Sequence, residues 1–156
     1  ERGGLYTTAD DGEALVVRQK DIFDNATPSA NSTAAVALYR LAALTGESRY
    51  AHHADRILQL LGRVIVRMPA AFSNLLAAVS MRLHGLGEVA VVGQRPDLVS
   101  AVQRRFLPYA VLAWGEPFDS PLWEGRREGF AYVCRDYACL APASTIDELQ
   151  QRLAVQ

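Results

Sequence analysis

The sequence predicts a mainly α-helical chain that ends in a small α/β unit. Its first half carries three apolar stripes at helical spacing, and each stripe ends at a glycine. In the second half the pattern changes, because short β-branched and aromatic runs alternate there with helical segments. The chain is therefore expected to divide into residues 1–86 and residues 87–156.

Composition sets limits on the partners of the protein. Half of the 156 residues are hydrophobic, which is enough for one ordinary domain or two small ones. Sixteen basic and seventeen acidic residues give a net charge of -1, so a general electrostatic grip on nucleic acid or an anionic membrane is not expected. No apolar run approaches the ~20 residues that span a bilayer, and no signal segment opens the chain. These features predict a cytoplasmic protein.

Residues 3–21 are expected to form a β-hairpin arm. Two β-prone runs, residues 5–8 and residues 15–17, flank the turn-forming residues 10–12. Two strands alone cannot make a core. We therefore interpret the hairpin as an arm or flap on the helices that follow.

Three helices are expected after this arm. The first begins near Ser29, whose hydroxyl is suited to cap it, and ends near Thr45. The second is predicted over residues 48–61, with Gly62 as its end, and the third over residues 69–83. Only a few residues link the first two helices, so these two are expected to pack as an antiparallel pair.

The second half is predicted to form a three-stranded α/β unit. Its strands are expected over residues 88–93, 109–115 and 130–134. A helical segment, residues 96–106, separates the first two strands, and this order implies that they are parallel. A last helix, residues 144–154, begins with Thr145 and Glu148 at the spacing of a capping box.

The order of several short segments resembles a known family. A "VRQKD" segment is followed by "DNATPSANS", "LYRLAALTGESRY", "MPAA", "EVAVVG" and "AYVCRDYACLAP". This order is similar to the C-terminal part of the thioredoxin-domain-containing proteins related to spermatogenesis-associated protein 20, a family of unassigned activity. The resemblance covers nearly the whole chain and departs at Asn25, where a glycine is usual in the family.

The resemblance implies an architecture that the residue patterns do not show. Members of the family carry a thioredoxin-like domain, followed by an (α/α) toroid resembling those of sugar epimerases and six-hairpin glycosidases. Residues 1–86 are then expected to be the terminal portion of such a toroid, and residues 87–156 a C-terminal subdomain. On this basis we expect a non-catalytic region that self-associates or packs against the missing N-terminal part.

The polar segment before the first helix is the main candidate site. Turn formation and capping account for Asp24 and Ser29, but Asn31 and Ser32 are poor helix formers. Helix N-termini offer free N–H groups that suit oxyanions or sugar hydroxyls. The predicted cavity-lining residues belong to this segment and to the strand before it: Arg18, Lys20, Asp24, Pro28, Ser29, Asn31 and Ser32.

Three functions remain open from the sequence. A toroid cavity would bind a carbohydrate or another small polar ligand without catalysis. A carbohydrate epimerase or hydrolase would need an acid and a base, and Asp24 is its one weak candidate. Cys134 and Cys139, spaced C-x4-C, fit either two ordinary residues beside a turn or a redox pair. No cofactor is expected and no metal site either, since the neighbours His52 and His53 cannot face one ion from a helix.

Overall fold

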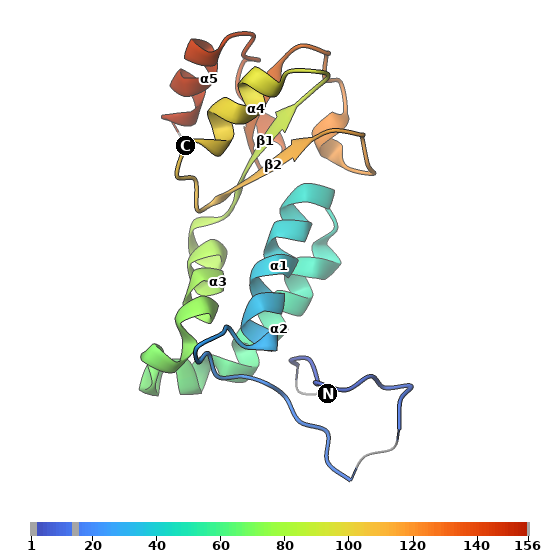
Figure 1. Ribbon diagram of the computed structural model, residues 1–156, viewed down its shortest axis with the longest axis vertical. Helices are drawn as coiled ribbons and strands as arrows, with labels where there is room; N and C mark the ends of the chain where they lie inside the picture. Colours follow the sequence, from blue (N-terminus) through green and yellow to red (C-terminus); the bar gives the residue numbers. More distant parts are fainter. Residues whose placement is uncertain (1–2, 14–15, 156) are drawn as a thin grey trace. The chain divides into compact units, whose positions relative to one another are not determined.

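The structure of this chain is a computed structural model that describes residues 3–13 and 16–155. Over these ranges it contains five α-helices, two short 3₁₀ helices and four strands (Figure 1). None of the helices in this described part is both long enough and apolar enough to cross a membrane.

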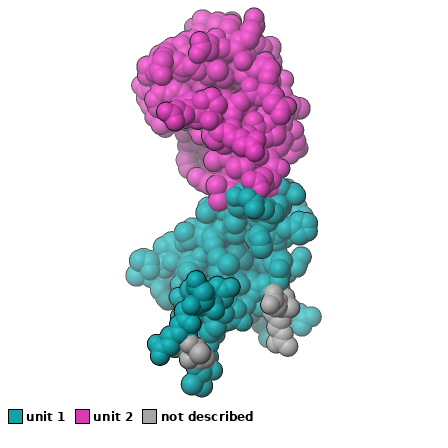
Figure 2. Space-filling model, turned by 90° about the vertical axis from the view of Figure 1, so that its right-hand side faces the viewer, with its two compact units in different colours: residues 1–39, 48–83 teal, residues 40–47, 84–156 magenta. Residues whose placement is uncertain are grey.

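The chain separates into two compact units (Figure 2). The helical unit comprises residues 1–39 and 48–83, and the sheet unit comprises residues 40–47 and 84–156. Helix α1 (Ala30–Thr45) contributes its first part to the helical unit and its last turns to the sheet unit.

The N-terminal segment of the helical unit is irregular, so the predicted hairpin is wrong for the described residues. One backbone hydrogen bond joins the two arms of this segment, from the Thr7 N–H to the Gln19 carbonyl at 2.9 Å, and neither arm forms a strand where it is described. Val16 and Val17 are exposed, so a strand pair here would have no buried face to stabilise it. Leu15, in the predicted second strand, lies outside the described residues.

Helix α1 begins one residue after its predicted cap. The Ser29 hydroxyl accepts a hydrogen bond from the Ser32 N–H at 3.2 Å, which confirms Ser29 as the N-cap. The Asp21 carboxylate accepts another from the Ala30 N–H at 2.8 Å. The helix ends before Gly46, whose φ of 77° lies in the left-handed region that often follows a helix.

Helix α2 (Ser48–Arg67) is longer than predicted, because Gly62 does not end it. The buried stripe continues past the glycine from Ile57 and Leu61 to Ile65, in steps of four residues. Burial of Ile65 offsets the ~1 kcal/mol that a glycine costs inside a helix. Tertiary packing therefore overrides the local stop signal.

Helix α3 (Ser73–His84) follows a single 3₁₀ turn (Pro69–Phe72). The spacing of apolar residues in the sequence predicts a buried stripe of Phe72, Leu75, Leu76, Val79 and Leu83. Leu76 and Leu83 are nevertheless exposed. The face that packs inward is rotated from the predicted one and has residues three apart: Phe72, Leu75, Ala78 and Met81.

The sheet unit contains a four-stranded mixed sheet, whereas the sequence predicts three strands. Its strand order is β2–β1–β3–β4, with β1 (Gly87–Val91) parallel to β2 (Ala110–Trp114) and antiparallel to β3 (Ala131–Arg135). The predicted parallel pair, joined through α4 (Pro96–Gln103), is confirmed. The missed strand, β4 (Ala138–Cys139), is two residues long and pairs with the end of β3.

A two-residue turn makes β4 possible. Asp136 and Tyr137 connect the two strands, and both have positive φ angles, 51° and 64°. Such angles are typical of a type I′ hairpin turn, which prefers Asn-Gly, so the Asp-Tyr pair gives little turn signal in the sequence. The Tyr137 hydroxyl donates a hydrogen bond to the Ala42 carbonyl at 2.8 Å, which helps to hold the turn in place.

Different elements cover the two faces of the sheet. Helices α4 and α5 (Ile146–Leu153) pack on one face (Figure 1). The core on that face includes Val89, Val91, Leu98, Val133 and Leu149. The other face is covered by a short 3₁₀ helix (Pro121–Trp123) and by Leu44 at the end of α1. Its buried residues are Ala90, Ala113, Leu122, Tyr132 and Cys134.

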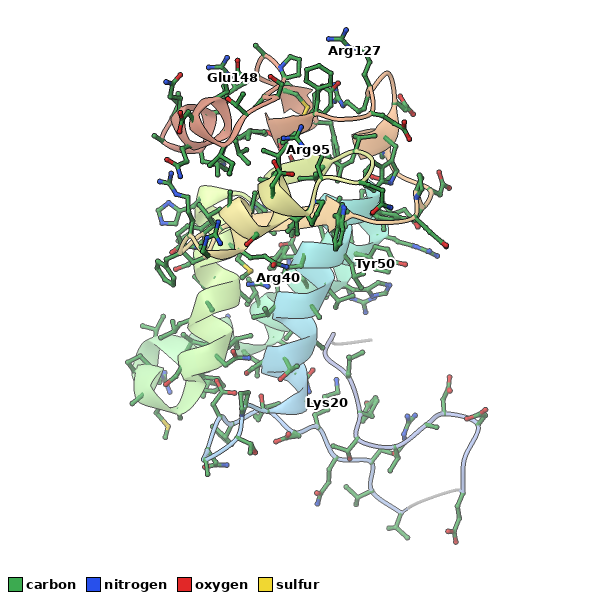
Figure 3. All side chains as sticks on the ribbon, turned by 45° about the horizontal axis from the view of Figure 1, so that its top comes forward. Lys20, Arg40, Tyr50, Arg95, Arg127 and Glu148 are labelled. Atoms are coloured by element: carbon green, nitrogen blue, oxygen red, sulfur yellow. A yellow bond between two sulfur atoms is a disulfide. The ribbon has the colours of Figure 1, made fainter. Side chains whose placement is uncertain are left out.

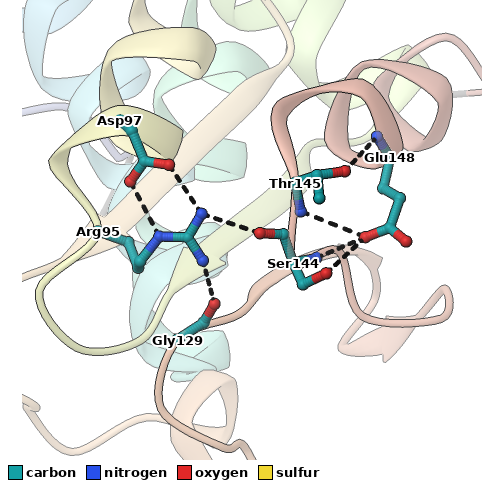
Figure 4. Close-up of polar contacts among 6 residues, drawn as sticks. All are labelled: Arg95, Asp97, Gly129, Ser144, Thr145 and Glu148. Carbon is teal, nitrogen blue, oxygen red and sulfur yellow. Dashed lines mark hydrogen bonds and ion pairs between the residues drawn. The ribbon is translucent and has the colours of Figure 1, made fainter.

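Polar contacts fix the starts of α4 and α5 (Figure 4). The Arg95 guanidinium forms an ion pair with Asp97 at 2.7 Å and donates to the Ser144 carbonyl at 2.9 Å. Beside it, the Glu148 N–H donates to the Thr145 hydroxyl at 3.3 Å, and the Glu148 carboxylate accepts from the Thr145 N–H at 3.2 Å. The predicted capping box of α5 is thereby confirmed.

Candidate functional site

The polar segment before α1 holds a hydrogen-bonded network that joins two helices. The Asp24 carboxylate accepts hydrogen bonds from the backbone N–H groups of Ser29, at 2.8 Å, and of Asn74 and Leu75, at 2.8 and 3.2 Å. One carboxylate therefore accepts hydrogen bonds from N–H groups at the starts of both α1 and α3. Burial acts to raise the pKa of Asp24, but these bonds and one with Ser32 outweigh it and hold that pKa below its usual value.

Asn31 is fully buried and fastens the N-terminal segment to α1. Its side-chain oxygen accepts from the Leu5 N–H at 2.7 Å, and its amide nitrogen donates to the carbonyls of Leu5 and Asp21 at 2.9 and 2.7 Å. The hydroxyl of Ser29 donates to that of Ser32 at 2.8 Å. The polar groups that capping alone left unexplained therefore have partners within the protein.

A pocket of about 820 Å³ lies in the helical unit, between the N-terminal segment and α2. Tyr6, Arg18, Lys20, His53 and Arg56 are among its lining residues. The charged groups of Arg18 and Lys20 lie 4.4 and 4.5 Å from the centre of the Tyr6 ring. Lys20 lies on the segment that leads into α1 (Figure 3). The other predicted site residues do not line the pocket: Asp24, Pro28, Ser29, Asn31 and Ser32.

Cys134 and Cys139 are joined by a disulfide bond across β3 and β4. They are direct partners in the strand register, and the Leu140 N–H donates to the Val133 carbonyl beside them at 2.9 Å. Cys134 is only 1% exposed, whereas Cys139 is partly exposed on β4, at the edge of the sheet. The two cysteines thus differ in their access to solvent.

Two ionisable residues that the sequence reasoning missed lie beside this disulfide. Glu88 on β1 is directly opposite Cys134 on β3, so their side chains project from the same face of the sheet. The Arg126 guanidinium lies 2.8 Å from the Cys139 sulfur and 4.9 Å from the centre of the Tyr132 ring. A charged residue inside an apolar strand, as in "GEVAVVG", is the signal that could have marked Glu88. We call Glu88, Cys134, Cys139 and Arg126 the disulfide row.

Glu88 is buried, with 2% of the residue exposed, and its Oε2 atom has no hydrogen-bond partner among the described residues. Burial raises the pKa of the Glu88 carboxyl above its ordinary value, and the Asp136 carboxylate adds to the rise. Arg135 and the backbone N–H groups of Asp136 and Tyr137 act in the opposite direction. Glu88 therefore keeps its proton to a higher pH than an exposed glutamate does.

Comparison with curated proteins finds mammalian relatives. Spermatogenesis-associated protein 20 of Homo sapiens is 30% identical over 170 residues, which cover 97% of this chain and 22% of that protein. This chain is homologous to spermatogenesis-associated protein 20. The proteins of the same name from Rattus norvegicus and Mus musculus are 29% and 28% identical, each over 97% of this chain and over 21% and 22% of their own length.

This homology confirms the family resemblance drawn from the sequence. The chain spans about a fifth of the length of these relatives. No family model matches the chain, and no solved structure matches it. The toroid that the resemblance implies therefore stays a proposal.

Proposed function

We propose that this chain is a non-catalytic, C-terminal region of a larger protein, and that its helical unit binds a carbohydrate or a small anionic ligand. Homology to about a fifth of a longer relative supports the first part. The second part depends on one observation, the convergence of Arg18 and Lys20 on Tyr6 at the edge of a pocket of about 820 Å³. Charged donors beside an aromatic ring are suited to sugar hydroxyls and oxyanions.

The geometry favours binding over sugar chemistry. Asp24, the weak catalytic candidate, accepts three backbone hydrogen bonds. Its lowered pKa makes it a poor proton donor at neutral pH. In this proposal Asp24, Asn31 and Ser32 hold the segment that carries Lys20, and Arg18 and Lys20 contact the ligand.

The helical unit is also proposed to pack against the rest of the larger protein or against a second copy, as the last helices of a toroid would. Val66, Met68 and Leu83 are 82%, 53% and 76% exposed. Large apolar side chains at this exposure favour a covering surface when they gather together. Sedimentation of the chain alone, compared with a longer product that contains it, distinguishes a second copy from the missing part.

Titration with inorganic sulfate and with glucose, followed by nuclear magnetic resonance, tests the binding proposal. The pair Arg18→Gln and Lys20→Gln should weaken binding of the probe by about tenfold for each charge-assisted bond lost. Arg63→Gln changes an exposed arginine of α2 outside the pocket and is the matched control. The proposal is overturned if neither probe shifts the pocket residues, or if the double variant binds as well as the control.

A second candidate function, thiol–disulfide exchange by the sheet unit, is favoured by the Cys134–Cys139 disulfide. Titration of thiols before and after treatment with a dithiol reductant tests it, since the chain has two cysteines in all. We expect two thiols after reduction and none before it. Two free thiols in the untreated chain, which cannot be reoxidised to a bond between these residues, would exclude this function.

A further inference from the structure

The position of Glu88 is costly for the fold. Its neighbour in the register on β2 is Val111, and the strand around it is apolar. Its Oε2 atom is buried without a partner among the described residues, and the Asp136 and Tyr137 N–H groups that bond the carboxyl do not offset the burial, since its pKa stays raised. An apolar residue of similar size would avoid this cost. A buried carboxyl at this position therefore indicates a role other than packing.

The strand register shows what this carboxyl faces. Glu88 is opposite Cys134, and Cys134 is opposite Cys139, so the three residues form a line across β1, β3 and β4. Directly opposite residues of antiparallel strands have Cβ atoms about 4.5–5.5 Å apart on one face of the sheet. The side chains of Glu88 and Cys134 are therefore direct neighbours on this face of the sheet.

Arg126 stands at the other end of this line. Its guanidinium contacts the sulfur of Cys139, the more exposed cysteine, at 2.8 Å and lies over the Tyr132 ring. A cation beside a cysteine favours the thiolate over the thiol. Each sulfur thus has an ionisable neighbour of a different kind, an acid at Cys134 and a permanent cation at Cys139.

We propose that the disulfide row is a thiol–disulfide exchange centre whose partner is a dithiol, with Glu88 as the proton-transfer group of Cys134 and Arg126 as the stabiliser of the Cys139 thiolate. This inference rests on the second candidate function above. The partner approaches along β4, because Cys139 lies on the edge strand and Cys134 is enclosed.

Reduction then proceeds in two balanced steps. One thiolate of the partner attacks the Cys139 sulfur and forms a mixed disulfide, while the bond to Cys134 breaks and Cys134 takes the proton of Glu88. The second thiolate of the partner attacks the partner's own sulfur in the mixed disulfide and releases Cys139 as a thiolate beside Arg126. The partner becomes a disulfide and loses two electrons, this chain gains them, and Glu88 recovers a proton from solvent.

The pH dependence of reduction by dithiothreitol tests the role of Glu88. Glu88→Gln keeps the size of the side chain but removes its acidic proton, so reduction below the raised pKa of Glu88 should slow by about tenfold or more. The difference should shrink as pH rises and wild-type Glu88 ionises, against the effect of Asp136 and with the help of Arg135 and the N–H groups of Asp136 and Tyr137. Glu116→Gln, at an exposed glutamate of the same unit, is the control.

Alkylation of the reduced chain tests the role of Arg126. Iodoacetamide should modify Cys139 first, and Arg126→Gln should shift the pH midpoint of that reaction upward by about one unit. Arg127→Gln is the matched control, because Arg127 is the next residue and its side chain is exposed (Figure 3). Circular dichroism of each variant checks that the sheet unit stays folded.

The outcomes separate this inference from the function on which it rests. A disulfide that dithiothreitol does not reduce, or that is absent from the purified chain, overturns the exchange function itself. Reduction at a normal rate with the same pH profile in wild type and Glu88→Gln overturns the role of Glu88 alone. An unchanged midpoint for Cys139 in Arg126→Gln overturns the role of Arg126.

Discussion

The polar segment before α1 and the disulfide row both contain buried polar groups, but they differ in how completely these groups are hydrogen-bonded. In the first, the half-buried carboxylate of Asp24 accepts from the N–H groups of Ser29, Asn74 and Leu75, and the buried amide of Asn31 bonds the backbone of Leu5 and Asp21. In the second, one oxygen of Glu88 is buried without a partner in the described part of the chain. The first arrangement stabilises local structure, while the second costs free energy.

This difference shows that a count of polar residues is a weak guide to a site. The segment 24–33 is rich in hydrogen-bonding side chains, and its buried ones are used in holding α1, α3 and the N-terminal segment together. The strand 87–91 contains a single charged residue, Glu88. Partners that are missing, rather than polar groups that are numerous, distinguish the second region.

Asp24→Ala should be the most destabilising change. It removes the acceptor for three backbone N–H groups at two helix starts, for an expected loss of about 2–4 kcal/mol in the free energy of unfolding. Because the pKa of Asp24 is lowered in the folded state, its contribution is present above the unfolded pKa of about 3.9 and is lost as pH falls through the folded pKa. Urea unfolding followed by circular dichroism at several pH values measures both effects, with exposed Asp11→Ala as control.

Asn31→Ala should cost about 2–3 kcal/mol, because it removes a fully buried side chain that bonds the Leu5 N–H and the carbonyls of Leu5 and Asp21. Limited proteolysis should then cut the N-terminal segment faster. Asn25→Ala, at an exposed asparagine of the same segment, should change stability by less than about 0.5 kcal/mol. If Asn31→Ala instead keeps full stability and loses ligand binding, Asn31 is a site residue and the contrast between the two regions fails.

Glu88→Gln should increase stability by about 1 kcal/mol at a pH above the raised pKa of Glu88. The sign follows from linkage: the folded state holds the proton more tightly than the unfolded chain, so the ionised form carries a penalty. This penalty is full above the folded pKa and disappears below the unfolded value of about 4.3. Urea unfolding at acid and at mildly alkaline pH measures the gain. A loss of stability at alkaline pH would mean that the hydrogen bonds from the Asp136 and Tyr137 N–H groups outweigh the cost of burying the carboxylate.

Much of the local structure could be predicted because it depends on residues close in the chain. The Ser29 cap and the Thr145–Glu148 capping box are formed by residues three positions apart. The parallel pairing of β1 and β2 follows from the connection between them, which is long enough to contain the helix α4. Two predictions were wrong for the same reason: that Gly62 ends a helix, and that residues 3–21 form a hairpin. In each case the burial of apolar side chains, which depends on tertiary packing, outweighed the local sequence signal.

The amino-acid sequence is enough to predict where the helices begin, the caps at Ser29 and Thr145, and the order of strand and helix in the second half. It also carries the homology to spermatogenesis-associated protein 20. The hydrogen bond from the start of α3 to Asp24, fifty residues away, and the pairing of Glu88 with Cys134 can be seen in the folded chain alone. Caps and periodicity arise from backbone geometry over a few residues, whereas these contacts depend on strand pairing and helix docking between distant segments. Whether a buried polar group has a partner is therefore a property of the fold, and in this protein it distinguishes a structural network from a candidate reactive centre.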